Sequence, residues 1–410
     1  MVKNVIFIES NTTGTGEIFA QLSSELGYKP SLIVSDPDKY SSVFKTAAEI
    51  LVAQTNNTDE VLEMCRNLSR QRELAGITSS SEYYMYTAAV IARMLKLQGP
   101  DPEAINRTRN KYIQRETLRK NNMPVPGYMR AHNSEEAVMA AEKIGYPVVV
   151  KPVLASGSEG VRLCGISQEV RSHAEELLKI KMNPRGQLNP DYILVEEYMK
   201  GEEYSVEAFS KNGSINIIGI TKKYLGEKPA FMEVAHDFPA RLDENREKEL
   251  TDAVVLALNI IGLDWGPTHT EVKLTGEGPR IIEINPRLAG GMIPKLIKYS
   301  KGIDMILNTL KLVCGDEVDL EDQKKEENVS IRFLVPAENG RVIGVNGIEE
   351  AGQIDNIEEI EIYEKKLEKF THLKGDFNDR LGHVIARGDS NTQCHMALSK
   401  AVNKISFLIE

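Results

Sequence analysis

The segment THTEVKLTGEGPRIIEINPRLAGGM, at positions 268–292, carries three side chains suited to a divalent cation and one suited to a phosphate. The cation ligands are Glu271, Glu283 and Asn285, and the phosphate ligand is Arg287. Carboxylate and amide oxygens suit Mg²⁺ and leave coordination positions for water and phosphate. Carboxylates among apolar strand residues are costly to bury without a partner, so these acids need an explanation. A salt-bridged surface hairpin is the alternative.

Two short strands must bring these side chains together. We predict strands at 270–274 and 280–285, joined by a glycine-containing turn. Alternate residues of a strand point to one face, so Glu283, Asn285 and Arg287 share a face. Pairing across the hairpin then places the acid of the first strand close to those of the second.

A second group of residues is suited to binding phosphates. Lys151 ends the apolar strand PVVVKP (147–152), and an ammonium at the end of a buried strand needs an anion. The loop ASGSEG (155–160) offers backbone N–H groups and hydroxyls to phosphate oxygens, although a plain β-turn explains it equally well by itself. It is not a Walker A loop, because GxxxxGK[ST] does not occur in the chain. Lys111, on a basic helix predicted at 105–121, is a second lysine beside this region.

The acidic segment VEEYMKGEEYSVE, at 195–207, reads as an extended stretch, a turn at Gly201 and a strand. An extended hinge can recognise adenine through its backbone, while a nearby carboxylate accepts hydrogen bonds from both ribose hydroxyls. A solvated acidic hairpin is the alternative, and the segment alone favours it.

Composition excludes several classes of function. A net charge of −10 over 410 residues argues against a nucleic-acid partner held by a basic surface. No apolar run approaches the roughly 20 residues of a membrane span, and we read the apolar N-terminal run as a buried strand. The four cysteines lie far apart, which indicates reduced thiols in a cytoplasmic protein.

The order of predicted elements suggests α/β and α+β units. Residues 1–100 alternate strands and helices, as in a parallel sheet with crossover helices. A connecting basic helix (101–126) leads to a small lobe (127–192). A larger antiparallel lobe with the metal site follows at 193–315, and 316–410 is a β-rich accessory part of that lobe with a closing helix at 392–408.

The turn NTTGTG after the first strand is a partial dinucleotide fingerprint. Gly14 and Gly16 fit the pattern, but Phe19 occupies the position of its third glycine. A nicotinamide dehydrogenase would rest on these two glycines alone, and a tight turn in an α/β domain explains them adequately.

Six motifs in one order resemble the ATP-grasp superfamily of carboxylate–amine ligases, over roughly residues 1–314. This resemblance implies an ATP-grasp fold in which two α+β lobes grip ATP behind an N-terminal parallel-sheet domain. It also implies ATP and two Mg²⁺ ions, with Mn²⁺ as an alternative ion. In chain order the motifs are Lys111, VVVKP, ASGSEG, VEEYMKGEEYSVE, TEVKL and IIEINPR.

The resemblance gives each motif a role. The two lysines would contact phosphates, the loop would close over them, the hinge would hold adenine mainly through its backbone, and Glu203 would bind the ribose. Glu271, Glu283 and Asn285 would hold the metal ions, and Arg287 would contact the transferred phosphoryl group and the acyl intermediate. The residues implied to hold ATP are Lys111, Lys151, Ser156, Gly157, Ser158, Gly160, Glu196, Glu197, Tyr198, Met199 and Glu203.

The acceptor side is similar to the L-amino acid ligases, the dipeptide-forming branch that includes the bacilysin-pathway enzyme. The segment FMEVAHDFPA resembles a loop in which a Glu and a His three residues later face the substrates, and Glu233 and His236 match that spacing. In RLAGGMIP, Gly290 and Gly291 would leave space for an amino-acid side chain. The chain has Asn285 where some members of the branch have another residue, so this motif does not define the substrate.

The resemblance implies a ligase that joins two L-amino acids through an acyl phosphate, giving a dipeptide, ADP and phosphate. Arg287 and His236 would stabilise the oxyanion, and Glu233 would hold the incoming ammonium and accept its proton. His236 also fits an ordinary packed residue. An ATP-grasp carboxylase, a purine-biosynthesis-type ligase and a non-catalytic nucleotide-binding regulator are the alternatives. The expected partners are ATP and two small amino acids, without nucleic acid or membrane, and the resemblance suggests a homodimer.

Overall fold

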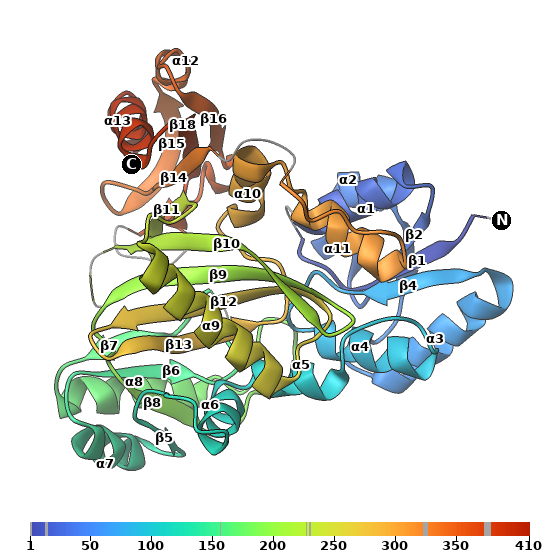
Figure 1. The fold of residues 1–410 in the computed structure, drawn as a ribbon, viewed down its shortest axis with the longest axis horizontal. Coiled ribbons are helices and arrows are strands. Elements are labelled where there is room, and N and C mark those ends of the chain that lie inside the picture. The colour runs from blue at the N-terminus through green and yellow to red at the C-terminus, as the bar shows by residue number, and fades with distance from the viewer. Residues whose placement is uncertain are drawn as a thin grey trace.

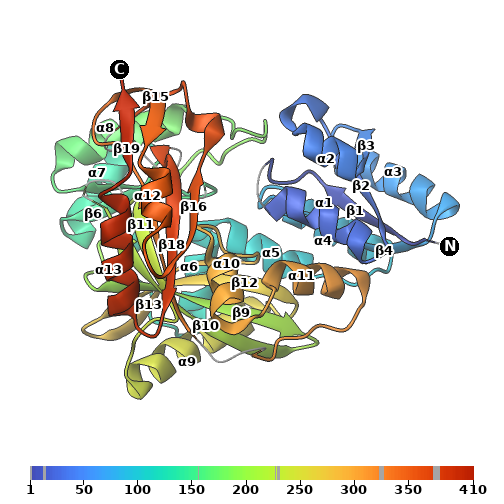
Figure 2. The same ribbon diagram turned by 90° about the horizontal axis from the view of Figure 1, so that it is seen from above.

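The protein is described by a computed structural model whose N-terminal, small and large units surround a common centre (Figure 1). The predicted fold class is confirmed, because a parallel N-terminal sheet is followed by antiparallel sheets. Figure 2 shows the N-terminal unit, in blue, beside the other two units. The structure describes residues 2–12, 15–155, 157–226, 228, 231–322, 327–372 and 379–410.

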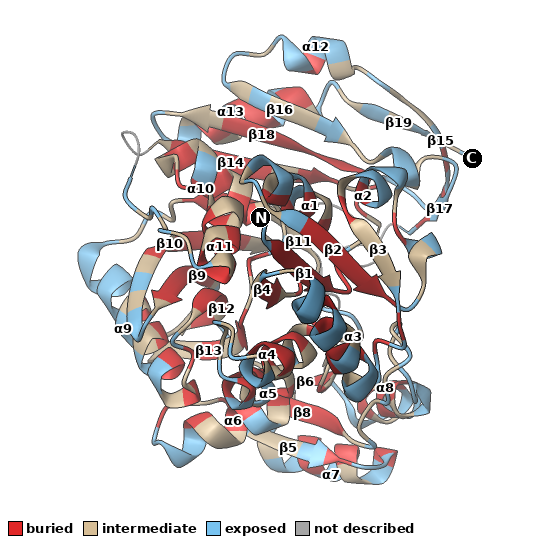
Figure 3. Ribbon diagram, turned by 90° about the vertical axis from the view of Figure 1, so that its right-hand side faces the viewer, coloured by how far each residue is buried: buried red, intermediate tan, exposed pale blue. Residues whose placement is uncertain are grey.

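The N-terminal unit is a four-stranded parallel sheet in the order β3-β2-β1-β4. Figure 3 shows its inner strands as buried, and the apolar run 4–8 is indeed a core strand. The elements are β1 (Asn4–Ile8), α1 (Thr15–Glu25), β2 (Lys29–Val34), η1 (Pro37–Lys39), α2 (Ser42–Ala47), β3 (Glu49–Val52), α3 (Thr58–Gln71), β4 (Leu74–Thr78) and α4 (Met85–Met94).

The single basic helix predicted at 105–121 is wrong, because two helices occupy this region. They are α5 (Pro102–Arg109) and α6 (Lys111–Lys120), separated at Asn110. The Asn110 side chain accepts hydrogen bonds from the backbone N–H groups of Tyr112 and Ile113, which starts a new helix. The break places Lys111 at the beginning of α6.

The small lobe is a four-stranded antiparallel sheet in the order β5-β8-β6-β7, with two helices. Its strand β8 covers residues 193–197, which the sequence placed in the large lobe. The pairing sets Lys151 opposite Leu194 and Val149 opposite Glu196, so the motifs predicted to bind phosphate and adenine are neighbours in one sheet. The elements are β5 (Tyr128–Ala131), α7 (Ser134–Ile144), β6 (Val148–Pro152), β7 (Arg162–Cys164), α8 (Ser167–Lys179) and β8 (Ile193–Glu197).

The large lobe is an eight-stranded antiparallel sheet in the order β13-β12-β9-β10-β11-β14-β18-β16. Helix α9 packs Leu250 and Val254 on Val206 and Val272 of one face. The alternate residues of β9 and β12 are polar and face the other way, toward the centre of the molecule. The elements up to 314 are β9 (Glu202–Lys211), β10 (Ser214–Leu225), β11 (Glu233–Phe238), α9 (Glu244–Ile261), β12 (Gly266–Thr275), β13 (Gly278–Asn285), α10 (Ile293–Lys301) and α11 (Met305–Cys314).

Three strands of the C-terminal part continue the large sheet, and three others form a separate sheet, β17-β15-β19. The helix predicted at 392–408 ends at Val402, because residues 406–409 form a strand that pairs with β15. The elements are β14 (Asn328–Leu334), β15 (Gly340–Asn346), α12 (Ile348–Gly352), β16 (Ile357–Ile362), η2 (Glu364–Lys366), β17 (Phe370–Thr371), β18 (Gly382–Gly388), α13 (Asn391–Val402) and β19 (Ser406–Ile409).

Two further expectations concern the whole chain. All four cysteines are free thiols, as predicted. Among the helices in the described ranges, none combines the length and the apolar character that crossing a membrane would require.

Candidate active site

The predicted hairpin is confirmed as β12 paired with β13. Glu271 lies directly opposite Glu283, and His269 lies opposite Asn285. The three predicted metal ligands therefore converge on one face of two adjacent strands. Their oxygen donors fit a hard divalent cation such as Mg²⁺, and the nearby carboxylates already attract two lysine ammonium groups.

A cavity of about 630 Å³ lies where the three units meet. The N-terminal unit contributes the loop 78–83, the small lobe contributes 157–161, and the large lobe contributes the hairpin with the predicted metal ligands. The three units therefore share one site, as a reaction that combines several substrates requires.

The predicted site residues that the structure describes line this cavity, with one exception. Ser156, predicted to close over the phosphates, lies outside the described residues, as does Gly14 of the partial dinucleotide fingerprint. The exception is His236. The predicted residues on the wall are Lys111, Lys151, Gly157, Ser158, Gly160, Glu196, Glu197, Tyr198, Met199, Glu203, Glu233, Glu271, Glu283, Asn285, Arg287, Gly290 and Gly291.

Lys151 and Glu196 form a closed ion network at the nucleotide end. The Lys151 ammonium contacts the Glu196 carboxylate, which also accepts a hydrogen bond from Arg115 at 2.7 Å. Burial lowers the pKa of Lys151, and the ion pair with Glu196 offsets this only in part. The Glu196 side chain is thus paired with two cations, so the predicted contact of this segment with adenine would have to use its backbone.

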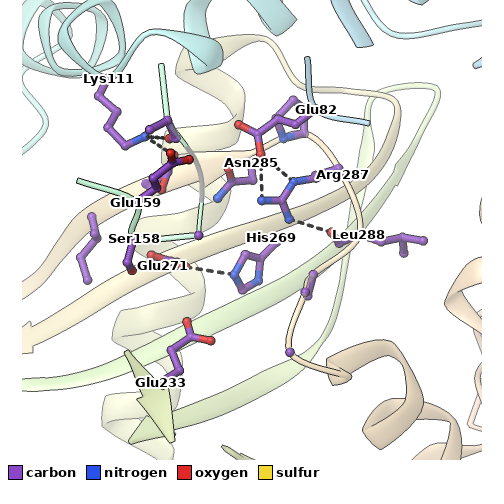
Figure 4. A pocket seen from close by; sticks show the side chains of 18 of the residues that line it. Glu82, Lys111, Ser158, Glu159, Glu233, His269, Glu271, Asn285, Arg287 and Leu288 are labelled. Carbon is purple, nitrogen blue, oxygen red and sulfur yellow. Dashed lines mark hydrogen bonds and ion pairs between the residues drawn. The ribbon is translucent and has the colours of Figure 1, made fainter. Parts of the chain in front are cut away.

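Lys111 connects the metal-ligand hairpin to the glycine loop (Figure 4). Its ammonium lies 2.8 Å from Glu283 Oε1 and donates to the carbonyl of Ala155 at 2.5 Å. In the loop beyond, Gly157, Ser158 and Gly160 all have φ between 62° and 69°. Left-handed backbone of this kind turns successive N–H groups toward one side, which suits an anion.

Lys223, which the sequence did not single out, is the centre of an acidic cluster. Its buried ammonium lies 2.6 Å from Glu271 Oε1, contacts Glu233, and is 3.8 Å from Glu203. Burial opposes its charge, but Glu233 and Glu271 more than offset that effect and raise its pKa. Glu203 has a second partner in Lys273, at 3.1 Å.

His269 supports the predicted metal ligand Glu271 from the same strand. Its Nε2 lies 3.3 Å from Glu271 Oε1, and its Nδ1 lies 2.9 Å from Glu207 Oε1. Burial disfavours the imidazolium, but Glu207 outweighs burial and raises the pKa of His269 to about 9. A protonated imidazole thus holds both carboxylates in place.

Glu82 of the N-terminal unit faces Arg287, and the sequence did not predict this contact. The Nε and Nη2 atoms of Arg287 both lie 2.9 Å from Glu82 Oε2 (Figure 4), and Arg109 contacts the other oxygen. Burial would raise the pKa of Glu82, but the two arginines lower it. A carboxylate from another domain therefore completes this side of the cavity.

His236 does not reach the cavity wall, which corrects the prediction that it faces the substrates. It is fully buried behind Gly291, where an added Cβ would lie 2.5 Å from its Nε2. Its Nε2 lies 3.4 Å from Glu233 Oε2, and within the described residues neither ring nitrogen makes a hydrogen bond. Burial lowers the pKa of His236, so a neutral ring supports Glu233 from behind.

Comparisons with known protein families match two separate parts of the chain. The ATP-grasp domain family matches residues 144–295, and the L-amino acid ligase C-terminal domain 2 matches residues 332–410. The protein y4rH of Sinorhizobium fredii is 32% identical over 409 residues, which cover 100% of this chain and 84% of that protein. The chain belongs to the ATP-grasp superfamily. It is a carboxylate–amine ligase related to the L-amino acid ligases, as the motifs predicted.

Two further relatives bear on the branch of this ATP-grasp ligase. The alanine–anticapsin ligase of Bacillus subtilis is 28% identical over 311 residues, which cover 71% of this chain and 66% of that ligase. The chain thus spans slightly less than two thirds of that relative. The L-amino acid ligase structure from Bacillus licheniformis has a TM-score of 0.82 at 20% identity, covering 100% of this chain and 99% of that one, and it shows the fold.

Proposed function

We propose that this ligase joins the carboxylate of one L-amino acid to the α-amino group of another, giving a dipeptide, ADP and phosphate. The observation that carries this proposal is a pair of acids, Glu82 and Glu233, in one cavity with Arg287, the metal ligands and the phosphate-binding lysines. Two free amino acids bring two ammonium groups. Glu233 can receive one of them, and Glu82 can receive the other when Arg287 leaves it for the substrate carboxylate. The relatives' names, which include alanine–anticapsin ligase and L-arginine-specific L-amino acid ligase, support the same reaction class.

The nucleotide would lie between the small lobe and the hairpin. Lys111 and Lys151 would contact its phosphates, and Glu203 would accept hydrogen bonds from its ribose. Glu271, Glu283 and Asn285 would hold Mg²⁺, as two ions or as Mn²⁺ in its place. When bound, the metal would offset negative charge on the phosphoryl group during its transfer.

The first half of the reaction would take place beside Arg287. Glu82 would hold the ammonium of the first amino acid, while Arg287 orients the carboxylate oxygen that attacks the γ-phosphorus of ATP. That oxygen forms a new bond to phosphorus, and the bond to ADP breaks. The product of this step is an acyl phosphate, which water would hydrolyse unless the small lobe and its glycine loop shield the cavity.

The second half would take place beside Glu233. This carboxylate would hold the incoming ammonium and accept its proton, which frees the nitrogen lone pair for attack on the acyl carbon. Arg287 would stabilise the oxyanion, and phosphate would then leave. His236, behind Gly291, would act by positioning Glu233.

The first experiment is phosphate release from ATP and Mg²⁺ across all pairs of the twenty L-amino acids, with mass spectrometry of the products. Release that depends on a pair and matches a dipeptide mass would establish the ligase and name its substrates. Failure of every pair would remove this function and favour another carboxylate or amine.

A variant pair tests the metal site. We expect Glu283→Gln to lower product formation by roughly 10²–10³-fold while thermal unfolding is unchanged, because a carboxylate that would hold the metal is lost. Glu277→Gln is the matched control, since Glu277 lies in the turn of the same hairpin and its side chain is largely exposed. Wild-type turnover of Glu283→Gln at ordinary Mg²⁺ would exclude Glu283 as a ligand. The predicted homodimer would be tested by light scattering on the same samples.

A further inference from the structure

Arg380 reaches the acceptor end of the cavity from the C-terminal part of the chain. It lies just before β18, lines the cavity and is 8% exposed. Its Nη2 donates a hydrogen bond to the backbone carbonyl of Glu233 at 2.7 Å and lies 3.5 Å from Glu233 Oε2. A guanidinium and a carboxylate thus stand side by side on one stretch of wall.

Aromatic packing fixes the plane of this guanidinium. Its central carbon lies 3.7 Å from the centre of the Phe333 ring, on β14. Phe333 in turn meets the ring of His236 edge-on, with centroids 5.5 Å apart and an interplanar angle of 82°. A guanidinium stacked on a ring is both attracted and oriented, so its hydrogen-bonding edge is set in advance.

Each cation of the cavity wall lies beside a specific carboxylate, and for Arg380 this is Glu233. Arg287 faces Glu82, Lys151 faces Glu196, and Lys223 is shared among three carboxylates. Arg380 is the cation beside the acid assigned to the incoming amine.

We propose that Arg380 binds the α-carboxylate of the amino acid whose amine attacks. This inference rests on the proposed ligase function. An amino acid is a zwitterion whose ammonium and carboxylate are joined by one carbon, and Glu233 beside Arg380 is its charge complement. A planar guanidinium matches a carboxylate with two parallel hydrogen bonds. The acceptor site therefore selects α-amino acids with a free carboxylate over their amides and over simple amines.

This assignment also gives the C-terminal part a role in the reaction. Phe333 and Arg380 both lie within the segment that matches the L-amino acid ligase C-terminal domain. Phe333 is on a strand that continues the large sheet beside β11, which begins at Glu233. The extension of the sheet thus carries a substrate-binding residue to the position where the acceptor is held.

The test compares each acceptor amino acid with its own amide, after the substrate pair is known. The wild-type enzyme should favour the free acid, and Arg380→Ala should lower kcat/KM for the free acid by roughly 10–100-fold, as expected for a hydrogen-bonded charge. Its preference for acid over amide should then fall close to one. The KM values for ATP and for the carboxyl-side amino acid should change less than about twofold, because those sites use other residues.

Matched variants separate binding from structural support. Arg387→Ala removes an arginine of β18 that pairs with Glu327 and Glu358 at the surface, and it should keep the wild-type preference. Arg380→Lys keeps the positive charge and should retain part of the preference for acid over amide. If the alanine variant does not fold, the lysine variant still tests the proposal. An equal loss on acid and amide, an unchanged preference in folded Arg380 variants, or a wild-type enzyme without any preference would each overturn the proposal. Absence of any dipeptide product would instead overturn the ligase function itself.

Discussion

Two buried lysines of the same cavity, Lys151 and Lys223, have opposite electrostatic surroundings. Both are nearly inaccessible to solvent. The pKa of Lys151 is lowered, because burial dominates and it shares its partner Glu196 with Arg115. The pKa of Lys223 is raised, because Glu203, Glu233 and Glu271 outweigh the same burial.

The difference lies in the ratio of cations to carboxylates. At the nucleotide end, two cations meet one carboxylate, so the local excess is positive and suits phosphate. At the acceptor end, the Lys223 ammonium is shared by three carboxylates. Each of these carboxylates also has a second cationic neighbour, Lys273 for Glu203, Arg380 for Glu233 and His269 for Glu271. The number of carboxylates around each lysine, and not the net charge of its end of the cavity, thus sets the two pKa values apart.

Removing the shared ammonium should have the largest effect. We expect Lys223→Met to lower the free energy of unfolding by roughly 3–5 kcal/mol and to abolish turnover, because the carboxylates lose their common partner. Chemical denaturation in metal-free buffer measures this change. Added Mg²⁺ should then raise Tm more in the variant than in the wild type, because the ion restores positive charge between the acids.

The neighbouring lysine provides the control for that variant. Lys222 precedes Lys223 in the same strand but pairs with Glu202 at the beginning of β9, and Lys222→Met should cost about 0–1 kcal/mol. Equal losses of unfolding free energy in Lys222→Met and Lys223→Met would show that the number of carboxylates around a lysine does not determine its contribution to stability.

At the nucleotide end the expected effect is on binding. Lys151→Met leaves Glu196 paired with Arg115, so stability should change less than in Lys223→Met. Its affinity for a non-hydrolysable ATP analogue should fall by roughly 10–100-fold, as for the loss of one hydrogen bond to a charged group. Calorimetric titration gives the affinity, with Lys200→Met, an exposed lysine of the hinge, as control. Unchanged affinity would remove Lys151 from the phosphate site.

Sequence predicted the lysine at the nucleotide end and missed the one at the acceptor end. Lys151 follows an apolar run, which marks it as buried, and the hairpin acids are spaced by two, which marks a shared face. Lys222 and Lys223 are adjacent and look equivalent in sequence. Only the register that sets Lys223 opposite Glu203 on β9 and His236 on β11 decides which of them turns inward.

The other contacts that the sequence did not predict correctly also depend on the packing of distant segments. Glu82 and Arg380 approach the cavity from units far away in sequence, and their contacts depend on how those units pack. His236 matches the spacing of a substrate-facing residue, but the close approach of Gly291 covers its ring. The spacing of residues in the sequence thus predicted which side chains the hairpin contributes to the cavity. The contacts between domains could be identified only from the structure.

A carboxylate outside the cavity gives a further test of the rule that the number of oppositely charged or hydrogen-bonding partners sets the pKa of a buried group. Glu359 of β16 accepts hydrogen bonds from Lys295 at 2.6 Å and Tyr299 at 2.8 Å, and lies 3.1 Å from Nε2 of His383. Burial raises its pKa, but these three partners more than offset burial and lower it to about 2. Glu359 is thus one acid surrounded by three donors, whereas Lys223 is one donor surrounded by three acids.

The sign of the pH dependence follows from that shift. A carboxylate with a lowered pKa in the folded protein stabilises it at pH values above the unfolded pKa, about 4.3, and this contribution is lost as the pH falls toward 2. We expect Glu359→Gln to cost about 1–2 kcal/mol at pH 7. The gap to wild type should close between pH 4 and pH 2 in urea unfolding, whereas Glu358→Gln, at an exposed neighbour, should show a smaller change. A gap that stays constant with pH would mean that the carboxylate charge contributes no stability, and the ratio of partners would then not explain the difference between the two lysines.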